Sequence, residues 1–166
     1  MFKDGLTRFA TYEYTTKVKD ISKRFIHLTN FSVNKHSKKF VKNAKSEKDG
    51  EGSKWSLVAL RKHYDENGID SKQLFANIKD VIIKTCISAE PVMLDIHSKT
   101  QEKRNCGFEL YGFDILIDNK LKPWLMEVNV CPSLSSSSPM DRRIKHTLLT
   151  DTLNIIGLEY INQRAL

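Results

Sequence analysis

Two apolar segments joined by a short polar turn decide the fold class of this chain. Residues 108–118 read FELYGFDILID, and residues 121–130 read LKPWLMEVNV. Both segments are rich in aromatic and β-branched residues, which is typical of strands, and the Asp-Asn-Lys sequence at 118–120 is typical of a turn. The two segments therefore predict an antiparallel β-hairpin. Because Pro123 cannot donate a backbone hydrogen bond, we expect it at an edge or at a non-bonded position.

The predicted hairpin gathers three side chains that carry oxygen ligands. If the turn has two or four residues, Asp114 faces Leu125 and Gly112 faces Glu127. Since side chains alternate along a strand, Asp114, Glu127 and Asn129 then project from the same face. A turn of three residues would shift the pairing by one and would separate Asp114 from Glu127.

This polar group predicts a magnesium site, with an ordinary solvent-facing strand surface as the alternative that alternation leaves open. Carboxylate and amide oxygens inside an apolar hairpin are costly unless a positive charge compensates them. Mg²⁺ prefers such oxygen ligands and completes its coordination with water and substrate phosphates. A functional patch is favoured because the opposite face is expected to be fully apolar, consisting of Ile115, Ile117, Trp124, Met126 and Val128.

The remaining elements are predicted from helical spacing of apolar residues and from capping residues. Together with the hairpin they indicate an α+β fold, with an antiparallel sheet and flanking helices. In chain order we expect a strand at residues 6–12, a helix over 55–64 capped by Ser53, a long helix capped by Asp70 or Ser71 and ended or kinked at Pro91, the hairpin, and a helix from Asp141 to about Gly157.

The positive charge of the chain is concentrated in one segment. The 166 residues carry a net charge of +7, and residues 17–54 hold this whole excess. Within that segment, residues 36–53 are almost wholly polar and predict a long, exposed and mobile basic loop. A solvated linker is the plain interpretation, and a binding surface for an acidic protein is the functional one. Nucleic acid is disfavoured, because few aromatic residues alternate with the lysines and no nucleic-acid-binding motif is present.

Composition excludes several other classes of protein. No apolar run approaches the roughly 20 residues of a membrane span, and the N-terminus does not read as a secretory signal. Cys86, Cys106 and Cys131 are too far apart for a zinc motif and odd in number. We therefore expect a reducing, cytoplasmic environment in which the cysteines are small buried residues.

Several motifs in a fixed order resemble the tubulin tyrosine ligase-like family, and in particular its polyglutamylases. The resemblance covers nearly the whole chain. The combination of His-Leu-Thr-Asn with Glu-Val-Asn-x-x-Pro-Ser is the most specific part of it. The matching segments are residues 4–11 (DGLTRFAT), 27–35 (HLTNFSVNK), 54–56 (KWS), 108–118, 121–129 and 132–134 (PSL).

The resemblance implies a role for individual residues. Asp114, Glu127 and Asn129 match the family's Mg²⁺ ligands, in agreement with the hairpin argument. Thr29 and Asn30 match residues that contact ATP. The positions that bind the incoming free L-glutamate are matched by Arg8, Ser32, Lys54 and Lys145, and Arg8 and Glu127 are the expected catalytic residues. The chemistry is suitable, because Arg and Lys pair with carboxylates.

The family implies an ATP-grasp fold and an ATP-dependent ligation. A side-chain γ-carboxylate of an acidic tubulin tail would be phosphorylated, and the amine of glutamate would then displace the phosphate. The expected partners are tubulin tails, microtubules and glutamate, for a monomer located in the cytoplasm on the cytoskeleton, including the cilium or basal body. Residues 1–166 match only the C-terminal portion of the catalytic domain. We therefore expect a fragment without the upstream lobe, inactive alone.

Two alternatives remain open from the sequence. One is a glycine or tyrosine ligase of the same family, which Arg8, Lys54 and Lys145 disfavour because three cations suit an acidic amino acid. The other is a non-catalytic tubulin-binding module that relies on the basic segment.

Overall fold

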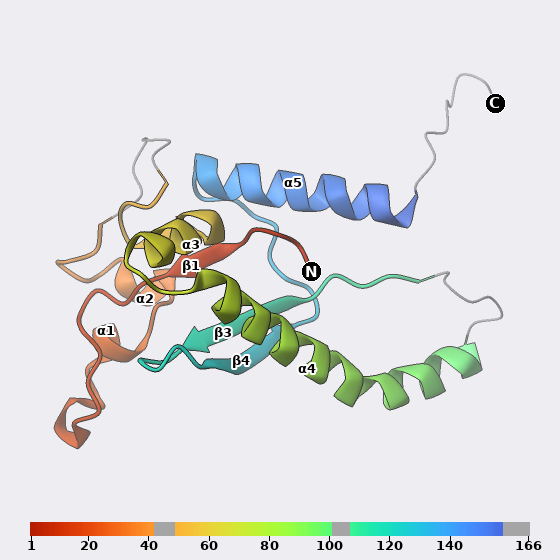
Figure 1. Cartoon of the computed structure of the whole chain (residues 1–166), viewed down its shortest axis with the longest axis horizontal. Helices are drawn as coiled ribbons and strands as arrows, with labels where there is room; N and C mark the ends of the chain where they lie inside the picture. The colour runs from red at the N-terminus through yellow and green to blue at the C-terminus, as the bar shows by residue number, and fades with distance from the viewer. Residues whose placement is uncertain (42–48, 101–106, 158–166) are drawn as a thin grey trace. The chain divides into compact units, whose positions relative to one another are not determined.

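The computed structural model describes residues 1–41, 49–100 and 107–157, and Figure 1 labels most of its helices and strands. Helices are mixed with two small antiparallel sheets, which confirms the expected α+β class. The chain divides into two compact units. One unit comprises residues 69–134 together with Met1, and the other comprises residues 2–68 and 135–166.

The second of these units begins with a short sheet. Strand β1 (Leu6–Arg8) pairs antiparallel with β2 (Lys54–Ser56), and α3 (Leu57–Glu66) follows β2 directly. The expectation that Ser53 caps a helix containing residue 55 was wrong, because β1 recruits residues 54–56 into a strand. The helix instead starts after Ser56, whose fully buried hydroxyl accepts a hydrogen bond from the backbone N–H of Ala59 at 3.0 Å.

The described residues of the same unit form four further helices. The three helices between β1 and β2 in the sequence are short, and the C-terminal helix α5 is long. The α5 cap is Ser138, and Gly157 ends the helix in the left-handed conformation as expected. The helices are η1 (Val18–Asp20), α1 (Arg24–His27), α2 (Phe31–Asn34) and α5 (Pro139–Ile156). The unit's buried apolar side chains include Leu60 and Ile144.

The other unit is built from a long helix and the hairpin. Helix α4 (Ser71–Thr100) begins as expected, with Asp70 Oδ1 accepting a hydrogen bond from the backbone N–H of Gln73 at 2.9 Å. Pro91 lies inside α4 and does not end it. The helix buries Leu74, Phe75 and Ile78, and it packs against β4.

The hairpin forms with a different register from the predicted one. Strands β3 (Gly112–Ile117) and β4 (Pro123–Asn129) pair antiparallel, with Asp114 opposite Glu127 and Gly112 opposite Asn129. The predicted pairing of Asp114 with Leu125 was wrong, because Ile115 takes that partner. Two features move the register: residues 118–122 form the turn, and a β-bulge follows Asp114. The bulge brings Asp114 and Glu127 onto one face after the turn has shifted the strands.

The turn owes its length to Asp118. Its Oδ1 accepts hydrogen bonds from the backbone N–H groups of Lys120 and Lys122 at 2.8 and 2.9 Å, and its Oδ2 accepts one from Trp124 Nε1 at 2.9 Å. These bonds, that of Trp124 first, hold the pKa of Asp118 below its usual range. Because the turn spans residues 118–122, Trp124 pairs with Leu116. Trp124 therefore shares the face of Asp114 and does not lie on the opposite apolar face, where we expected it. Pro123 stands at the start of an edge strand, as predicted.

Other expectations also meet the structure here. Cys86 and Cys131 are exposed and free, which corrects the prediction of buried cysteines, since α4 buries a stripe that does not contain Cys86. Cys106 and residues 42–48, the centre of the predicted basic loop, lie outside the described residues. None of the described helices combines the length and apolarity that a membrane span requires.

Candidate functional site

Two of the predicted glutamate-binding cations face each other across the β1–β2 sheet. Arg8 is the register partner of Lys54, so both side chains project from the same face. Like charges directly opposite each other destabilise a sheet. An anion near this face would reverse that cost, and the protein supplies one such anion in Asp141.

Asp141 and Lys54 form a largely buried ion pair. Lys54 Nζ lies 2.7 Å from Asp141 Oδ2 and 3.2 Å from Ser137 Oγ. The same carboxylate oxygen accepts hydrogen bonds from the backbone N–H and the hydroxyl of Ser137, at 3.1 and 2.8 Å. The side chain of Asp141 is only 4% exposed, whereas that of Lys54 is 22% exposed. Lys54 therefore remains within reach of a ligand while Asp141 fixes its direction.

The environment of Asp141 favours its ionised form. Burial would raise the pKa of Asp141, but the hydrogen bonds from Lys54 and Ser137 and the charge of Lys54 together hold that pKa below its usual range. In the part of the chain that the structure describes, the other carboxylate oxygen, Oδ1, is buried without a hydrogen-bond partner. This carboxylate is thus an anion held in place by a cation and a serine.

Lys145, the third predicted cation, reaches the same serine-rich segment. Its Nζ donates a hydrogen bond to the backbone carbonyl of Ser135, on the segment that also contacts Lys54 through Ser137. Residues 135–138 form the loop that leads into α5. The structure shows that they hold Lys54 and Lys145 and cap α5, since Ser138 Oγ accepts from the backbone N–H of Asp141 at 3.2 Å.

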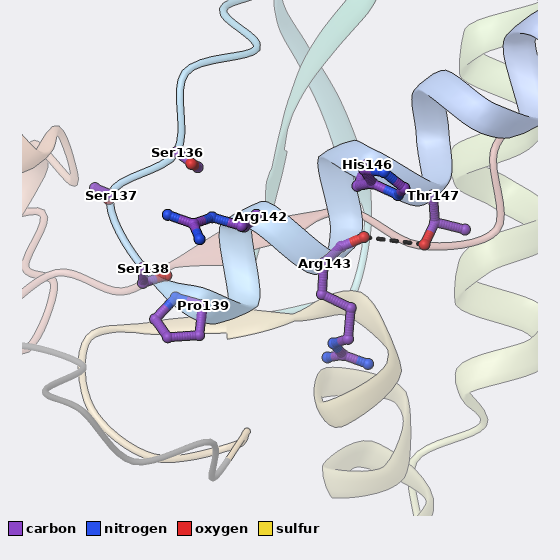
Figure 2. A pocket seen from close by; sticks show the side chains of 8 residues that line it. All are labelled: Ser136, Ser137, Ser138, Pro139, Arg142, Arg143, His146 and Thr147. Atoms are coloured by element: carbon purple, nitrogen blue, oxygen red, sulfur yellow. Dashed lines mark hydrogen bonds between the residues drawn. The ribbon is translucent and has the colours of Figure 1, made fainter.

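A groove opens beside this segment at the start of α5 (Figure 2). Its volume is about 580 Å³, and its polar lining is mostly cationic or hydroxylic. Arg143 lies on the groove wall, and its Nη2 is 3.3 Å from Asp49 Oδ2. This ion pair connects the start of α5 to residues 49–53, the described residues at the C-terminal end of the predicted basic loop. The lining consists of Ser136, Ser137, Ser138, Pro139, Arg142, Arg143, His146 and Thr147.

The predicted ATP contacts lie on the loop before α2 in the same unit. Thr29 is half-buried and Asn30 is exposed. Asn30 occupies the N-cap position of α2, yet its side chain makes no capping hydrogen bond. Ser32 is exposed on α2, and within the described residues it forms no hydrogen bond to Arg8, Lys54 or Lys145. The structure therefore joins three of the four predicted glutamate-binding residues and leaves Ser32 separate from that network.

The predicted metal ligands lie in the other unit, on the hairpin. Asp114 and Glu127 are opposite each other, and Asn129 Nδ2 donates to Glu127 Oε1 at 3.1 Å. Two carboxylates and an amide suit Mg²⁺, although rotation of the Asn129 amide is needed to turn its oxygen towards a cation. No cluster of three or more His, Cys, Asp or Glu side chains able to hold a metal occurs in the described ranges. Any Mg²⁺ here would therefore take its remaining ligands from water and phosphate.

Two important residues escaped the sequence analysis. Asp141 was interpreted only as a helix start, and Asn34 only as part of the matching segment 27–35. The Ser-x-x-Asp spacing of Ser138 and Asp141 is a recognisable N-terminal helix signal, but it does not reveal a partner as distant as Lys54. For Asn34 the sequence holds no comparable signal.

Comparison with known proteins identifies a family for this arrangement. A model of the tubulin-tyrosine ligase family matches residues 1–164. Mouse tubulin polyglutamylase TTLL5 is 43% identical over 157 residues, which are 95% of this chain and 12% of that protein. Human tubulin monoglutamylase TTLL4 is also 43% identical over 157 residues, covering 95% of this chain and 13% of that protein.

A zebrafish relative extends the match along the chain. Danio rerio tubulin polyglutamylase ttll6 is 39% identical over 170 residues, covering 100% of this chain and 21% of that protein. The chain therefore spans between about an eighth and about a fifth of the length of these three relatives.

Proposed function

The chain belongs to the tubulin-tyrosine ligase family, and from that membership we propose that it supplies part of an ATP-dependent ligase that adds glutamate to acidic tubulin tails. The observation that carries this proposal is the group of three cations around residues 135–138. Arg8 faces Lys54 across a sheet, and Lys54 and Lys145 both contact the serine-rich segment. A free dicarboxylic amino acid is a suitable ligand for this group, because each of its carboxylates can pair with a cation.

In the proposed reaction, the terminal phosphoryl group of ATP passes to a γ-carboxylate oxygen of a tubulin glutamate, which yields ADP and an acyl phosphate. The amine of the incoming glutamate then attacks the acyl carbon and releases phosphate, and an isopeptide bond forms. Arg8, Lys54 and Lys145 would bind the incoming glutamate and orient its amine, with Ser32 adding a hydrogen bond. Arg8 would also neutralise charge that develops on the transferred group.

The nucleotide and its metal ion would meet the remaining candidate residues. Thr29 and Asn30 would contact ATP, and Asp114, Glu127 and Asn129 would hold Mg²⁺. When bound, Mg²⁺ supplies charge neutralisation for phosphoryl transfer. This assignment is supported by the oxygen-bearing side chains on the hairpin and by the side chain of Asn30, which makes no capping hydrogen bond. We infer that residues 1–166 contribute to an ATP-grasp domain.

The acidic tail would be attracted by the basic residues of the chain. Residues 17–54 carry the whole net charge of +7, and the groove of Figure 2 adds Arg142, Arg143 and His146. This concentration of positive charge attracts an acidic peptide by long-range electrostatics and does so less strongly at high salt. We further propose that the protein binds microtubules as a monomer, in the cytoplasm and in cilia or basal bodies. The names of the relatives favour glutamate over glycine or tyrosine as the amino acid added.

A non-catalytic tubulin-binding module is the competing function, and Glu127→Gln separates the two. In the complete protein that carries this chain, we expect this variant to lower glutamate incorporation by about 100-fold or more, and to leave sedimentation with microtubules unchanged. Glu109→Gln, an exposed carboxylate ahead of the same hairpin, is the matched control and should retain incorporation. Equal incorporation by the Glu127→Gln protein and the unaltered protein would reject the ligase assignment.

A further inference from the structure

Asn34 is the most completely buried polar side chain near the proposed nucleotide loop. It ends α2 and is 1% exposed. Its amide nitrogen donates two hydrogen bonds, to the carbonyl of Leu28 at 2.6 Å and to the carbonyl of Asn30 at 3.2 Å. Its Oδ1 accepts a hydrogen bond from Thr11 Oγ1 at 3.2 Å. Both N–H groups of the side-chain amide and its oxygen therefore have partners within the protein.

These contacts fix the backbone on both sides of Thr29. The Leu28 carbonyl belongs to the peptide group that precedes Thr29, and the Asn30 carbonyl belongs to the one that follows Asn30. One side-chain amide therefore restrains the peptide planes at both ends of the Thr29-Asn30 pair. The Asn30 carbonyl also accepts the backbone N–H groups of Val33 and Asn34, at 3.1 and 2.9 Å. The loop is thus held from behind, while the side chain of Asn30 is not used to cap the helix.

The third contact ties this loop to the segment after β1. Thr11 lies three positions beyond Arg8, and its hydroxyl is the donor that occupies Asn34 Oδ1. All of these residues belong to the same compact unit. Asn34 consequently links the strand of a predicted glutamate-binding residue to the loop of the predicted ATP contacts.

We propose that Asn34 is a positioning residue for ATP, which holds Thr29 and Asn30 in the geometry that contacts the nucleotide. The inference rests on the proposed function, in which Thr29 and Asn30 touch ATP. Asn34→Asp is the sharpest perturbation, because it keeps size and the acceptor for Thr11. It replaces the two N–H donors by an oxygen that faces and repels two carbonyl oxygens, and the Leu28 carbonyl loses the amide donor at 2.6 Å.

The test is isothermal titration calorimetry of the complete protein with ATP and Mg²⁺, followed by separate KM values for ATP and for glutamate. We expect Asn34→Asp to weaken ATP binding by about 10- to 100-fold, and to change the KM for glutamate by less than about twofold. Asn67→Asp is the matched control in the same unit. Its exposed amide donates to the carbonyl of His63 in the preceding helix α3, at 2.7 Å, and the loss of this hydrogen bond should leave ATP binding unchanged.

The outcomes are distinguishable. A folded Asn34→Asp protein that binds ATP like the unaltered protein would overturn the inference, as would equal losses for ATP and glutamate, which indicate a merely structural role. If the unaltered protein does not bind ATP, the proposed function itself fails. Should Asn34→Asp not fold, Thr11→Val removes one of the three hydrogen bonds. The inference then requires a smaller loss of affinity that is still selective for ATP, and an unselective or absent loss rejects it.

Discussion

The ion pair between Lys54 and Asp141 should contribute far more to stability than a surface pair. The perturbation is a double-mutant cycle of Lys54→Met and Asp141→Asn, in which each change removes a charge and preserves much of the side-chain shape. Lys54 Nζ and Asp141 Oδ2 lie 2.7 Å apart, and the same carboxylate oxygen also accepts two hydrogen bonds from Ser137. Both single variants leave one member of the pair without its charged partner.

The expected magnitude follows from the burial of the two groups. Removing one member of a fully buried pair costs about 3–5 kcal/mol. Because Lys54 is 22% exposed, water can solvate part of its ammonium group once Asp141 is neutral. We therefore expect a coupling free energy of about 1.5–3 kcal/mol, in the range of hydrogen bonds between charged groups.

The assay is urea unfolding of the four proteins of the cycle at neutral pH. Lys62 and Glu66 provide the matched control cycle in the same unit, with 3.7 Å between Nζ and Oε1 and side chains 76% and 62% exposed. Their coupling should not exceed about 0.5 kcal/mol. Equal coupling energies in the two cycles would refute the argument that burial makes the Lys54–Asp141 pair strong.

The pair should also give stability a defined dependence on pH. Because the folded protein lowers the pKa of Asp141, the ionised carboxylate stabilises the fold above the unfolded pKa of about 3.9. That contribution is lost as the pH falls through the lower pKa of the folded state. The coupling energy should therefore stay constant from about pH 7 to pH 5 and shrink below about pH 4. A coupling energy that grows on acidification would contradict this assignment of charge.

Two further predictions concern the core and the hairpin. Leu60→Ala should lower the free energy of unfolding by about 2–5 kcal/mol in a urea titration, because Leu60 is 3% exposed. The control Val58→Ala, at a residue that is 57% exposed, should change this free energy by less than about 0.5 kcal/mol. Similar losses in the two variants would disprove the packing argument. Gly112→Ala should raise the Mg²⁺ concentration needed for half-maximal ATP turnover, since the new Cβ would lie 2.9 Å from Pro132 Cβ and would press on the hairpin beside Asn129. Gly107→Ala, whose Cβ meets no atom within 4 Å, should leave that concentration unchanged, and an equal effect of both alanines would count against the hairpin as the metal site.

The hairpin shows how far sequence can predict this fold. Apolar and β-branched composition located both strands, because that signal is local. The register was mispredicted because it depends on Asp118, which binds two backbone N–H groups and widens the turn, and on a bulge beside Asp114. The shared face of Asp114 and Glu127 was predicted, but by a pairing that does not occur.

The β1–β2 sheet shows the same limit for helix starts. Ser53 precedes the apolar helical pattern that starts at residue 55 and Ser56 lies just inside it, and the preference of serine for the cap position does not choose between them. The choice is made by distant parts of the chain, since β1 pairs with residues 54–56 and Asp49 accepts a hydrogen bond from the backbone N–H of Ser56 at 2.9 Å. Tertiary contacts decide this boundary.

For the candidate site, the residue types were predictable and their partners were not. A resemblance to known motifs identified Arg8, Lys54 and Lys145. The structure added what holds them, namely Asp141 and the serine-rich segment. These supporting contacts join residues far apart in the chain, so no spacing rule reveals them.

Mass spectrometry of an acidic tubulin-tail peptide tests the central claim most directly. The complete protein is incubated with the peptide, Mg²⁺ and ATP, together with glutamate, glycine or tyrosine in separate reactions. The account predicts a ladder of peptide masses spaced by one glutamyl residue, which requires ATP and appears only with glutamate. Addition of glycine or tyrosine instead, or no addition with any of the three amino acids, would contradict it.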